Sequence, residues 1–308
     1  MKYLSLFSGI GGFEKAIQDI IPEAECVGFS EIDKYAISVY QRHFQHKNFG
    51  DISKIDIENL PDFELLVGGS PCQDLSIAKK DRKGLDGSRS GLFYKYVEIL
   101  KVKKPKWFIL ENVNSMPRES KEKISEILGV QPVMINAALV SAQNRKRLFW
   151  ANFPITQPED KGILLKAILE SGEVDEKYFI QGKEFDWITD KKRLAKKYSN
   201  IDGEKAITCC ARQYSSWNGQ YVTNAMGMGG GNVPMLMDKE TAENLKGKYI
   251  GNERQIIRKL TPVECARLQC FPDNWCEGIS NSQQYKCYGN AVNVEVVKHI
   301  IKDLKFNL

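Results

Sequence analysis

The first candidate for chemistry is a cysteine that follows an apolar strand and a glycine turn. Leu65-Leu66-Val67 predicts a buried strand, and the segment after it reads Gly68-Gly69-Ser70-Pro71-Cys72-Gln73. The two glycines leave room for a ligand beside the turn. Because open α/β sheets bind ligands at the carboxyl edge of their strands, Cys72 is placed for covalent chemistry. The alternative is an inert buried thiol, which is the commoner fate of an intracellular cysteine.

A carboxyl group and two guanidiniums are candidate partners for this thiol. Glu111 comes directly after the apolar run Trp107-Phe108-Ile109-Leu110, so we expect poor solvation to raise its pKa and let it share a proton with a bound base. Arg145 and Arg147 lead into a further strand, and alternation predicts that they share one face, where they could hold a phosphate or a pyrimidine oxygen. The alternative is a solvated basic edge.

The first third of the chain predicts a site for a nucleotide-like ligand. A strand over Tyr3-Leu4-Ser5-Leu6-Phe7 is followed by a turn containing Gly9, Gly11 and Gly12, and then by a helix up to Ile21. The dinucleotide pattern G-x-G-x-x-G is not matched, so a plain tight turn is the alternative.

Acidic residues end the next two predicted strands. Glu31 lies about 20 positions after the glycine turn, where a ribose hydroxyl is held in this architecture, and Ile32 could lie against an adenine. Asp51, followed by Ile52, could accept from an adenine amino group. Exposed turn acids are the alternative for both carboxylates.

Composition limits the class of protein. The 308 residues are 42% hydrophobic and 27% charged, as in a globular protein of one large or two smaller domains. No apolar run approaches the roughly 20 residues that span a bilayer. With three histidines and eight cysteines but no CxxC pair, a metal site has little support, and we expect free thiols in a cytoplasmic protein. The net charge of +5 permits a nucleic-acid partner without requiring one.

Later segments predict a mobile loop, a second domain and a return to the first. Residues 74–90 are polar and long enough for a lid. From about residue 152 the βα alternation fades, and residues 191–197 form a basic cluster. Residues 212–221 interleave a cation with amides, hydroxyls and aromatics, a mixture that contacts bases and phosphates, although a β-rich cap is the alternative. Thr261 predicts a helix N-cap before Pro262, and the segment from Tyr288 is expected to open the last helix.

These residues would suit methyl transfer to a cytosine. Carbon 5 of cytosine is a poor nucleophile, and addition of a thiolate to carbon 6 makes the ring an enamine that can attack a sulfonium methyl group. The addition moves charge toward ring nitrogen 3, where Glu111 could supply a neutral carboxyl, while Arg145 steadies the base and Arg147 holds that carboxyl or a phosphate. Because a stacked base is out of reach, it must be flipped out of a duplex.

Together these segments resemble the DNA (cytosine-5)-methyltransferase family, in its compact bacterial or phage form, with some similarity to the animal de novo branch. The resemblance covers Met1 to about Pro154 and Arg258 to Val297. The segments that carry it follow the family order: Leu6-Phe7-Ser8-Gly9-Ile10-Gly11-Gly12, Glu31, Asp51-Ile52, Gly69-Ser70-Pro71-Cys72-Gln73, Glu111-Asn112-Val113, Gln143-Asn144-Arg145-Lys146-Arg147, residues 258–273, Tyr285-Lys286, and Gly289-Asn290-Ala291-Val292. Ser5 departs from the pattern, because many members carry an acid there, and this is expected to weaken cofactor binding.

The resemblance implies a role for each matching residue. Cys72 is the nucleophile, with Glu111, Arg145 and Arg147 completing the catalytic group. Gln73 and Ser76 are expected to contact DNA, and Arg212, Gln213 and Asn218 are predicted to read bases. The S-adenosyl-L-methionine pocket is expected to be lined by Phe7, Gly9, Gly11, Gly12, Glu31, Ile32, Asp51, Ile52, Leu92, Asn290 and Val292.

The implied fold is α/β, a Rossmann-like mixed sheet with helices on both faces plus a smaller target-recognition domain. We expect the catalytic domain at residues 1–172 and 285–308 and the recognition domain at 173–284. The implied partner is double-stranded DNA, without membrane or metal, for a monomer in a bacterial or phage-infected cell, with a restriction endonuclease as a candidate companion. The alternatives are a tRNA cytosine-5 methyltransferase, a silent DNA-binding scaffold, and a nicotinamide-dependent oxidoreductase, which the glycine pattern disfavours.

Overall fold

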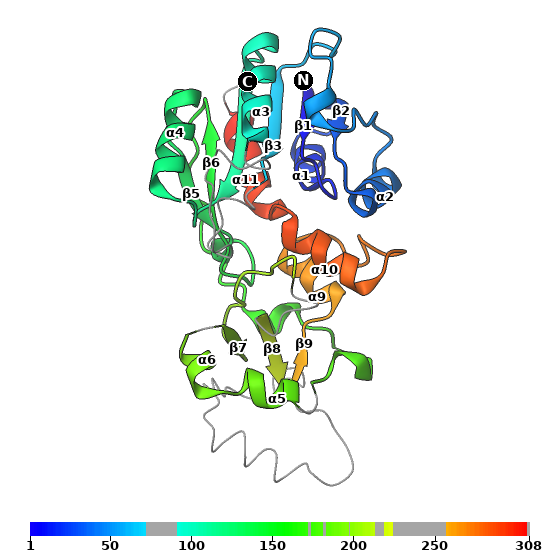
Figure 1. Ribbon diagram of the computed structural model, residues 1–308, viewed down its shortest axis with the longest axis vertical. Coiled ribbons are helices and arrows are strands. Elements are labelled where there is room, and N and C mark those ends of the chain that lie inside the picture. Colours follow the sequence, from blue (N-terminus) through cyan, green and yellow to red (C-terminus); the bar gives the residue numbers. More distant parts are fainter. Residues whose placement is uncertain are drawn as a thin grey trace. The chain divides into compact units, whose positions relative to one another are not determined.

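The chain forms two compact units in a computed structural model, which describes residues 1–71, 91–171, 174–180, 183–196, 198–212, 219–223 and 257–306 (Figure 1). Unit 1 comprises Met1–Ala137, Lys146–Glu159 and Ala291–Leu308, and unit 2 comprises Ala138–Arg145 and Asp160–Asn290. The predicted second domain, 173–284, therefore lies inside unit 2. Unit 2 begins earlier, at Asp160, ends later, at Asn290, and also includes the separate segment Ala138–Arg145.

Unit 1 is built on a six-stranded mixed sheet, in the order β2-β1-β3-β4-β6-β5. The first four of these strands are parallel, whereas β6 is antiparallel to both β4 and β5. The strands are β1 (Lys2–Leu6), β2 (Glu25–Ser30), β3 (Leu65–Gly69), β4 (Trp107–Val113), β5 (Val133–Asn136) and β6 (Lys146–Ala151). The predicted α/β class and mixed sheet are confirmed.

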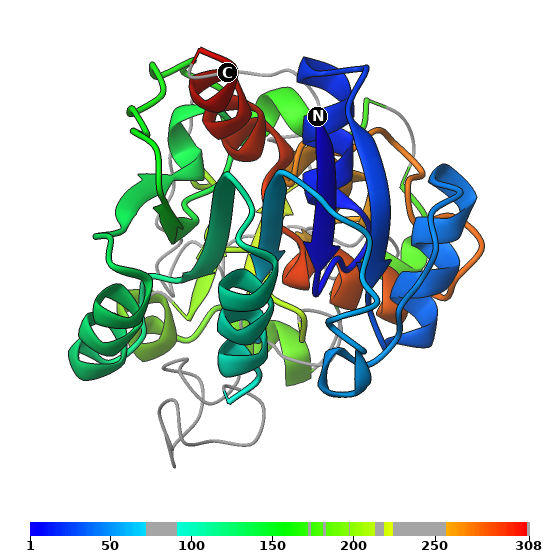
Figure 2. The same ribbon diagram turned by 90° about the horizontal axis from the view of Figure 1, so that it is seen from above.

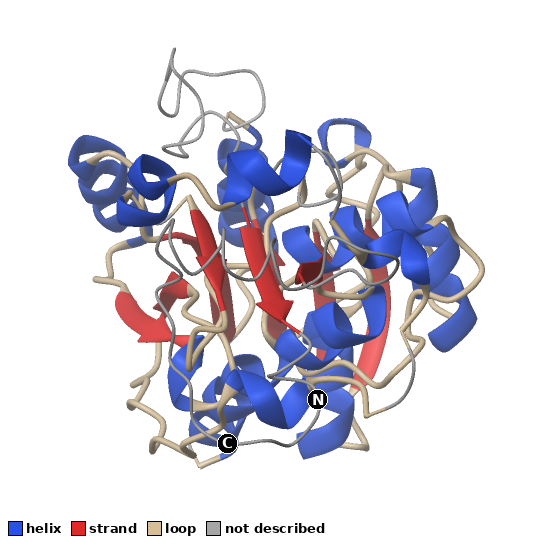
Figure 3. Ribbon diagram, turned by 90° about the horizontal axis from the view of Figure 1, so that it is seen from below, coloured by secondary structure: helices blue, strands red, loops and turns tan. Residues whose placement is uncertain are grey.

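Helices cover both faces of this sheet, with α1 and α11 on one face and α3 and α4 on the other (Figures 2 and 3). The helices of unit 1 are α1 (Gly12–Ile20), α2 (Lys34–His43), α3 (Leu92–Lys103), α4 (Arg118–Leu128) and α11 (Val294–Lys305), with a 3-10 turn η1 (Ile52–Lys54). A further turn, η3 (Ala137–Leu139), follows β5. Because the central strands are covered on both faces, their residues are apolar almost throughout, as in Leu65–Val67 and Phe108–Leu110, which are all buried.

The parallel strands place their carboxyl ends at one edge of the sheet. Leu6 pairs in register with Gly68, and Gly69 pairs with Glu111, so the ends of β1, β3 and β4 lie side by side. The sequence predicts that Glu111 directly follows its strand. In the structure it lies inside the strand, because pairing with β6 extends β4 to Val113. The carboxylate still stands at the edge where the glycine turn and β3 end.

Unit 2 contains a three-stranded sheet, in the order β7-β8-β9, and several short helices. Its strands are β7 (Ser199–Ile201), β8 (Gly219–Thr223) and β9 (Ile257–Lys259), and its helices are η4 (Leu165–Ile168), η5 (Glu176–Tyr178), α5 (Lys183–Ile188), α6 (Lys191–Ala195), α9 (Pro262–Leu268) and α10 (Asn281–Asn290). A small core of Ile180, Ile188, Ile201, Tyr221 and Ile257 joins the sheet to α5.

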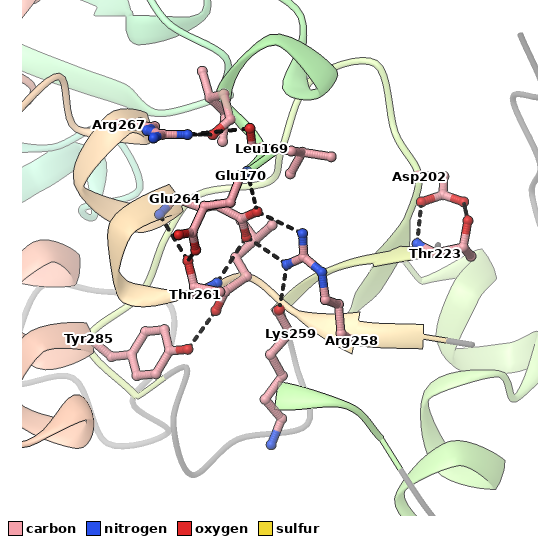
Figure 4. Close-up of polar contacts among 12 residues, drawn as sticks. Leu169, Glu170, Asp202, Thr223, Arg258, Lys259, Thr261, Glu264, Arg267 and Tyr285 are labelled. Carbon is pink, nitrogen blue, oxygen red and sulfur yellow. Dashed lines mark hydrogen bonds and ion pairs between the residues drawn. The ribbon is translucent and has the colours of Figure 1, made fainter. Parts of the chain in front are cut away.

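A buried ionic network fixes the start of α9 (Figure 4). Thr261 caps the helix as predicted, with its hydroxyl bonded to the Glu264 amide and the Glu264 carboxylate bonded back to the Thr261 amide. Arg258 donates from two nitrogens to the two oxygens of the same carboxylate, each at 2.7 Å. Glu264 is fully buried, and the Glu170 amide also donates to it.

The predicted last helix begins later than expected. Tyr288, Gly289 and Asn290 end α10 instead of opening the final helix, and α11 starts at Val294 with Asn293 as its N-cap. An asparagine side chain that bonds the Val296 amide is a good cap, and the sequence analysis overlooked it. None of the helices in the described part of the chain is long and apolar enough to cross a bilayer.

Candidate active site

An arginine–glutamate pair stands at the sheet edge in unit 1. Arg147 Nε lies 2.9 Å from Glu111 Oε1, and the two side chains are 17% and 12% exposed. Val113 and Arg147 are register partners on β4 and β6, so Glu111, two residues before Val113, is the diagonal neighbour of Arg147 on the same face. The sequence predicts that Arg147 holds either this carboxyl or a phosphate, and the structure shows the first arrangement.

The neighbouring strand leaves space for the Glu111 carboxylate. A side chain at Gly69 would bring its Cβ to 2.9 Å from Glu111 Oε2, so only glycine avoids this contact. Asn112, which faces the other way on β4, donates to the Ser70 carbonyl and hydroxyl at 3.2 and 2.9 Å. Asn112 therefore fixes the chain two residues before Cys72. Cys72 itself, with Gln73, Ser76 and the predicted lid, lies outside the described residues.

Arg145 has different partners from Arg147. It is 3% exposed, and its two terminal nitrogens donate to the main-chain carbonyls of Cys209 (2.9 Å) and Gly289 (3.1 Å), all within unit 2. The prediction that the two arginines share a strand face is wrong, because β6 begins at Lys146 and alternation does not extend to Arg145.

A buried glutamine reinforces the position of Arg145. The Gln143 amide donates to the Leu268 carbonyl and accepts from the Cys209 amide, which holds residues 143–145 against two other segments of unit 2. The sequence analysis assigned Gln143 no role. In the sequence it appeared only as the first residue of the family-like segment Gln143-Asn144-Arg145-Lys146-Arg147.

The glycine turn and Glu31 form one structure in unit 1. Phe7, Gly9 and Gly11 all have positive φ, and a Cβ at Gly9 would meet nothing within 4 Å, so the turn is open on that side. Glu31 Oε2 accepts from the Gly9 amide at 2.9 Å, while Oε1 accepts from the amides of Ile32 and Asp33. Glu31 therefore joins the turn to the end of β2.

The other predicted cofactor residues have varied surroundings. The Ile32 side chain is 68% exposed, so an apolar side chain next to Glu31 is accessible to a ligand. Asp51 caps η1 by accepting from Ser53, and these hydrogen bonds lower the pKa of its carboxyl. The Ile52 side chain is 4% exposed and lies in the core, and the partly buried Leu92 packs against that core. Val292 is partly buried in unit 1 and Asn290 is exposed at the end of unit 2.

The sequence analysis missed a fully buried carboxyl behind the glycine turn. Glu14 lies in the first turn of α1 and accepts a hydrogen bond from the Tyr40 hydroxyl at 3.1 Å. Burial raises the pKa of Glu14 from 4.5 to about 7, against the opposing effect of hydrogen bonds from Ser5, Tyr40 and Ser8. Ser5, expected to weaken the site for want of an acid, thus lies next to a carboxyl that comes from the helix. Glu14 lies at the edge of the apolar face of α1, three residues before Ile17.

Comparison with known proteins shows the family. A sequence model of the C-5 cytosine-specific DNA methylases matches residues 1–306. The chain belongs to this family. It is 30% identical to the orphan methyltransferase M.SPRI of Bacillus phage SPR, with 99% of this chain and 97% of that protein covered. It is also 30% identical to the type II methyltransferase M.HhaI of Haemophilus parahaemolyticus, with 100% and 95% covered.

Solved structures share the fold of this C5 methyltransferase. The Entamoeba histolytica methyltransferase EhMeth superposes with a TM-score of 0.77 at 20% identity, covering 100% of this chain and 98% of that one. Dnmt2 of S. pombe gives a TM-score of 0.73 at 19% identity, covering 100% and 99%. The protein is a DNA (cytosine-5)-methyltransferase that uses S-adenosyl-L-methionine, as the sequence predicts.

Unit 1 of this methyltransferase fits that cofactor. The open glycine turn suits the methionine part of such a ligand, the Glu31 carboxylate suits its ribose, and the exposed Ile32 side chain suits its adenine. When bound, S-adenosyl-L-methionine supplies an electrophilic methyl group. Within the described residues, no three His, Cys, Asp or Glu side chains gather as metal ligands.

Proposed function

We propose that the enzyme methylates cytosine in double-stranded DNA through a covalent Cys72 adduct on a flipped-out base. The observation that supports this proposal is the Arg147–Glu111 pair beside Gly69, three residues before Cys72 on the neighbouring strand. A thiol and a carboxyl so placed at one sheet edge could contact one pyrimidine from two sides.

In the proposed reaction the Cys72 thiolate forms a bond to carbon 6, and the electron pair of the 5,6 double bond is drawn toward nitrogen 3. A proton held by Glu111 at nitrogen 3 stabilises this enamine, and Arg147 keeps the carboxyl in place. Carbon 5 then takes the methyl group, while the methyl–sulfur bond of the sulfonium donor breaks to leave a neutral thioether, and the proton on nitrogen 3 returns to Glu111. Loss of the carbon 5 proton to a base and cleavage of the carbon–sulfur bond regenerate the thiolate and release 5-methylcytosine.

Covalent trapping tests this proposal. A duplex carrying 5-fluorocytosine, incubated with the enzyme and S-adenosyl-L-methionine, should give a band of protein bound to DNA in denaturing gels, because fluorine cannot leave as a proton does. Cys72→Ser should abolish the band. Cys26→Ser is the matched control, since Cys26 donates to the Gly28 carbonyl in β2 and a serine can do the same. Absence of the band with the native enzyme, or its persistence in Cys72→Ser, contradicts the proposal. Methyl transfer to tRNA and not to DNA would show that tRNA, instead of double-stranded DNA, is the substrate.

We assign Arg145 a positioning role, since both of its terminal nitrogens bond main-chain carbonyls. One of these carbonyls belongs to Gly289, directly before the predicted cofactor residue Asn290. Arg145→Ala should therefore weaken S-adenosyl-L-methionine binding measured without DNA, whereas Arg147→Ala should not. Gly289→Ala should reproduce the effect, because its Cβ would lie 2.2 Å from the Ala211 amide nitrogen. Unchanged cofactor affinity in Arg145→Ala contradicts this role.

We also propose that Arg212, Gln213 and Asn218 read the target bases. Arg212 is exposed at the end of the segment that Arg145 holds, and the other two lie outside the described residues. Arg212→Ala should relax the sequence preference at one base pair and leave cofactor binding intact. Bisulfite sequencing of DNA from cells that express each form measures this, and an unchanged site preference rules out Arg212.

A further inference from the structure

The basic cluster of the sequence forms a defined surface in unit 2. Residues 183–198 carry six basic and three acidic side chains, so this short segment supplies +3 of the net +5 of the whole chain. Of this segment, residues 183–196 and 198 are described, and they form α5, α6 and the residue before β7, next to the small sheet (Figure 1). The charge is therefore concentrated on one folded element.

One side of this element is fixed in the core of unit 2. Ile188 is fully buried, and Phe185 and Leu194 pack against the same cluster. Asp190 caps α6 by accepting from the Arg193 amide at 3.1 Å. This packing and the Asp190 cap also fix the outer side of α5 and α6. The shape of that outer side therefore does not depend on a bound ligand.

The outer side presents two aromatic rings joined by an arginine. Trp187 and Tyr198 are 46% and 48% exposed, an unusual state for a tryptophan. The Arg193 guanidinium carbon lies 4.2 Å from the Trp187 ring centre and 5.6 Å from that of Tyr198. These cation–π contacts hold both rings beside the guanidinium, and about half of each aromatic side chain remains exposed to solvent.

The segment keeps a charge of +3 after its three carboxylates are counted, and one of them, Asp186, is exposed beside Trp187. Glu184 is paired with Lys259 at 2.7 Å, and Asp190 is engaged in capping. Lys191, Lys192 and Lys196 are exposed. Exposed ammonium groups on the same short helix, close to half-exposed aromatic side chains, have the chemistry that binds a sugar–phosphate chain.

We propose that the α5–α6 surface, made by Trp187, Lys191, Lys192, Arg193, Lys196 and Tyr198, binds the backbone of duplex DNA outside the target base pair. The lysines contact phosphates, and the rings pack against the sugars. The proposal rests on duplex DNA being the substrate. A second copy of the chain is a poorer occupant, because two such surfaces would repel each other.

Salt dependence of DNA binding tests this surface. Lys191→Ala/Lys192→Ala should raise the Kd for a duplex on the order of tenfold at 0.15 M salt, and should reduce the slope of log K against log salt by about 1.8, or about 0.9 per lost phosphate contact. The matched control is Lys101→Ala/Lys302→Ala, which removes the same charge from exposed positions in α3 and α11 of unit 1. The slope of the control should match that of the native enzyme.

The aromatic part is tested separately. Trp187→Ala should weaken binding several-fold with an unchanged salt slope, because its contact is apolar. S-adenosyl-L-methionine affinity and the turnover rate at saturating DNA should stay unchanged in every variant. Equal slopes for the native enzyme and the Lys191/Lys192 variant overturn the proposal, as does a change in self-association measured by sedimentation, or a loss of RNA binding alone. Failure of the native enzyme to methylate DNA at all would instead refute the proposed function.

Discussion

Each unit of the molecule contains an arginine–glutamate pair, and the two pairs are built differently. In unit 2, Arg258 and Glu264 share two hydrogen bonds of 2.7 Å at 5% and 0% exposure, and amides of Thr261 and Glu170 complete the shell of the carboxylate. In unit 1, Arg147 meets Glu111 through Nε at 2.9 Å and directs Nη1 to the Lys146 carbonyl, with the side chains 17% and 12% exposed.

Under the proposed function, this difference separates a structural pair in unit 2 from a catalytic pair in unit 1. A buried pair whose oxygens all bond fixed donors has its whole capacity used in holding the fold. The Glu111 carboxylate instead lies at the carboxyl edge of a parallel sheet, next to a glycine that keeps space around one of its oxygens. Both pairs consist of an arginine and a glutamate. We therefore attribute the difference in their proposed roles to their location and to the hydrogen-bond donors around each carboxylate.

The largest effect should come from removing the carboxylate at the sheet edge. Glu111→Gln should lower kcat by about 10²–10⁴, the usual contribution of a positioned acid or base, because an amide cannot give nitrogen 3 a proton. The free energy of unfolding should hardly change. Single-turnover methyl transfer measures the first quantity and urea unfolding the second. The contrast fails if Glu111→Gln loses stability in proportion to activity.

The opposite pattern is expected for the pair in unit 2. Arg258→Ala leaves a buried carboxylate without its counter-ion, which should cost about 3–5 kcal/mol of stability. Arg147→Ala should cost no more than about 2 kcal/mol, because its partner is in part solvated. Urea unfolding of the full chain compares them, and Arg258→Met/Glu264→Leu should recover much of the loss. Equal losses in the two alanine variants would erase the distinction between the pairs.

Glu14 extends the comparison to a buried carboxyl that is held by hydroxyls. Its folded pKa of about 7 lies above its ordinary value of 4.5, so between these values the folded protein binds the extra proton. Stability from this group is therefore complete below about pH 4.5, and is lost as the pH rises to about 7, by on the order of 3 kcal/mol. Glu14→Gln should flatten this dependence in urea unfolding from pH 5 to 8. A slope as steep in the variant as in the native enzyme would assign the effect to other groups.

Sequence patterns could predict the parts of the site that follow from strand order. Leu65–Val67 and Trp107–Leu110 are apolar runs followed by glycine or glutamate, so the pattern of residues alone predicts the sheet edge that carries Glu111. The capping of α9 by Thr261 is equally local. The sequence also offered the Glu111 carboxyl as one of two partners for Arg147, on the grounds of opposite charge, and a phosphate as the other.

Contacts between distant segments could not be predicted in this way. Arg145 binds carbonyls 64 and 144 residues away, and no periodicity shows that it stands before its strand instead of in it. Glu14 lies at the edge of the apolar face of α1, where spacing leaves burial undecided, and its hydrogen-bond partner Tyr40 comes from the next helix. The clearance at Gly69 likewise depends on strand register, which the pattern leaves undefined.

The smallest change tests whether this clearance matters. In Gly69→Ala the new Cβ would lie 2.9 Å from Glu111 Oε2, and the carboxylate can yield because it ends a flexible side chain. Stability should therefore be almost unchanged, whereas kcat should fall by about tenfold, since small displacements of a catalytic group reduce rates strongly. Cofactor affinity should not change, because Gly69 is not among the residues of the glycine turn. A kcat equal to that of the native enzyme would mean that catalysis tolerates a displaced Glu111 carboxylate. The Arg147–Glu111 pair would then have no catalytic role to distinguish it from the Arg258–Glu264 pair.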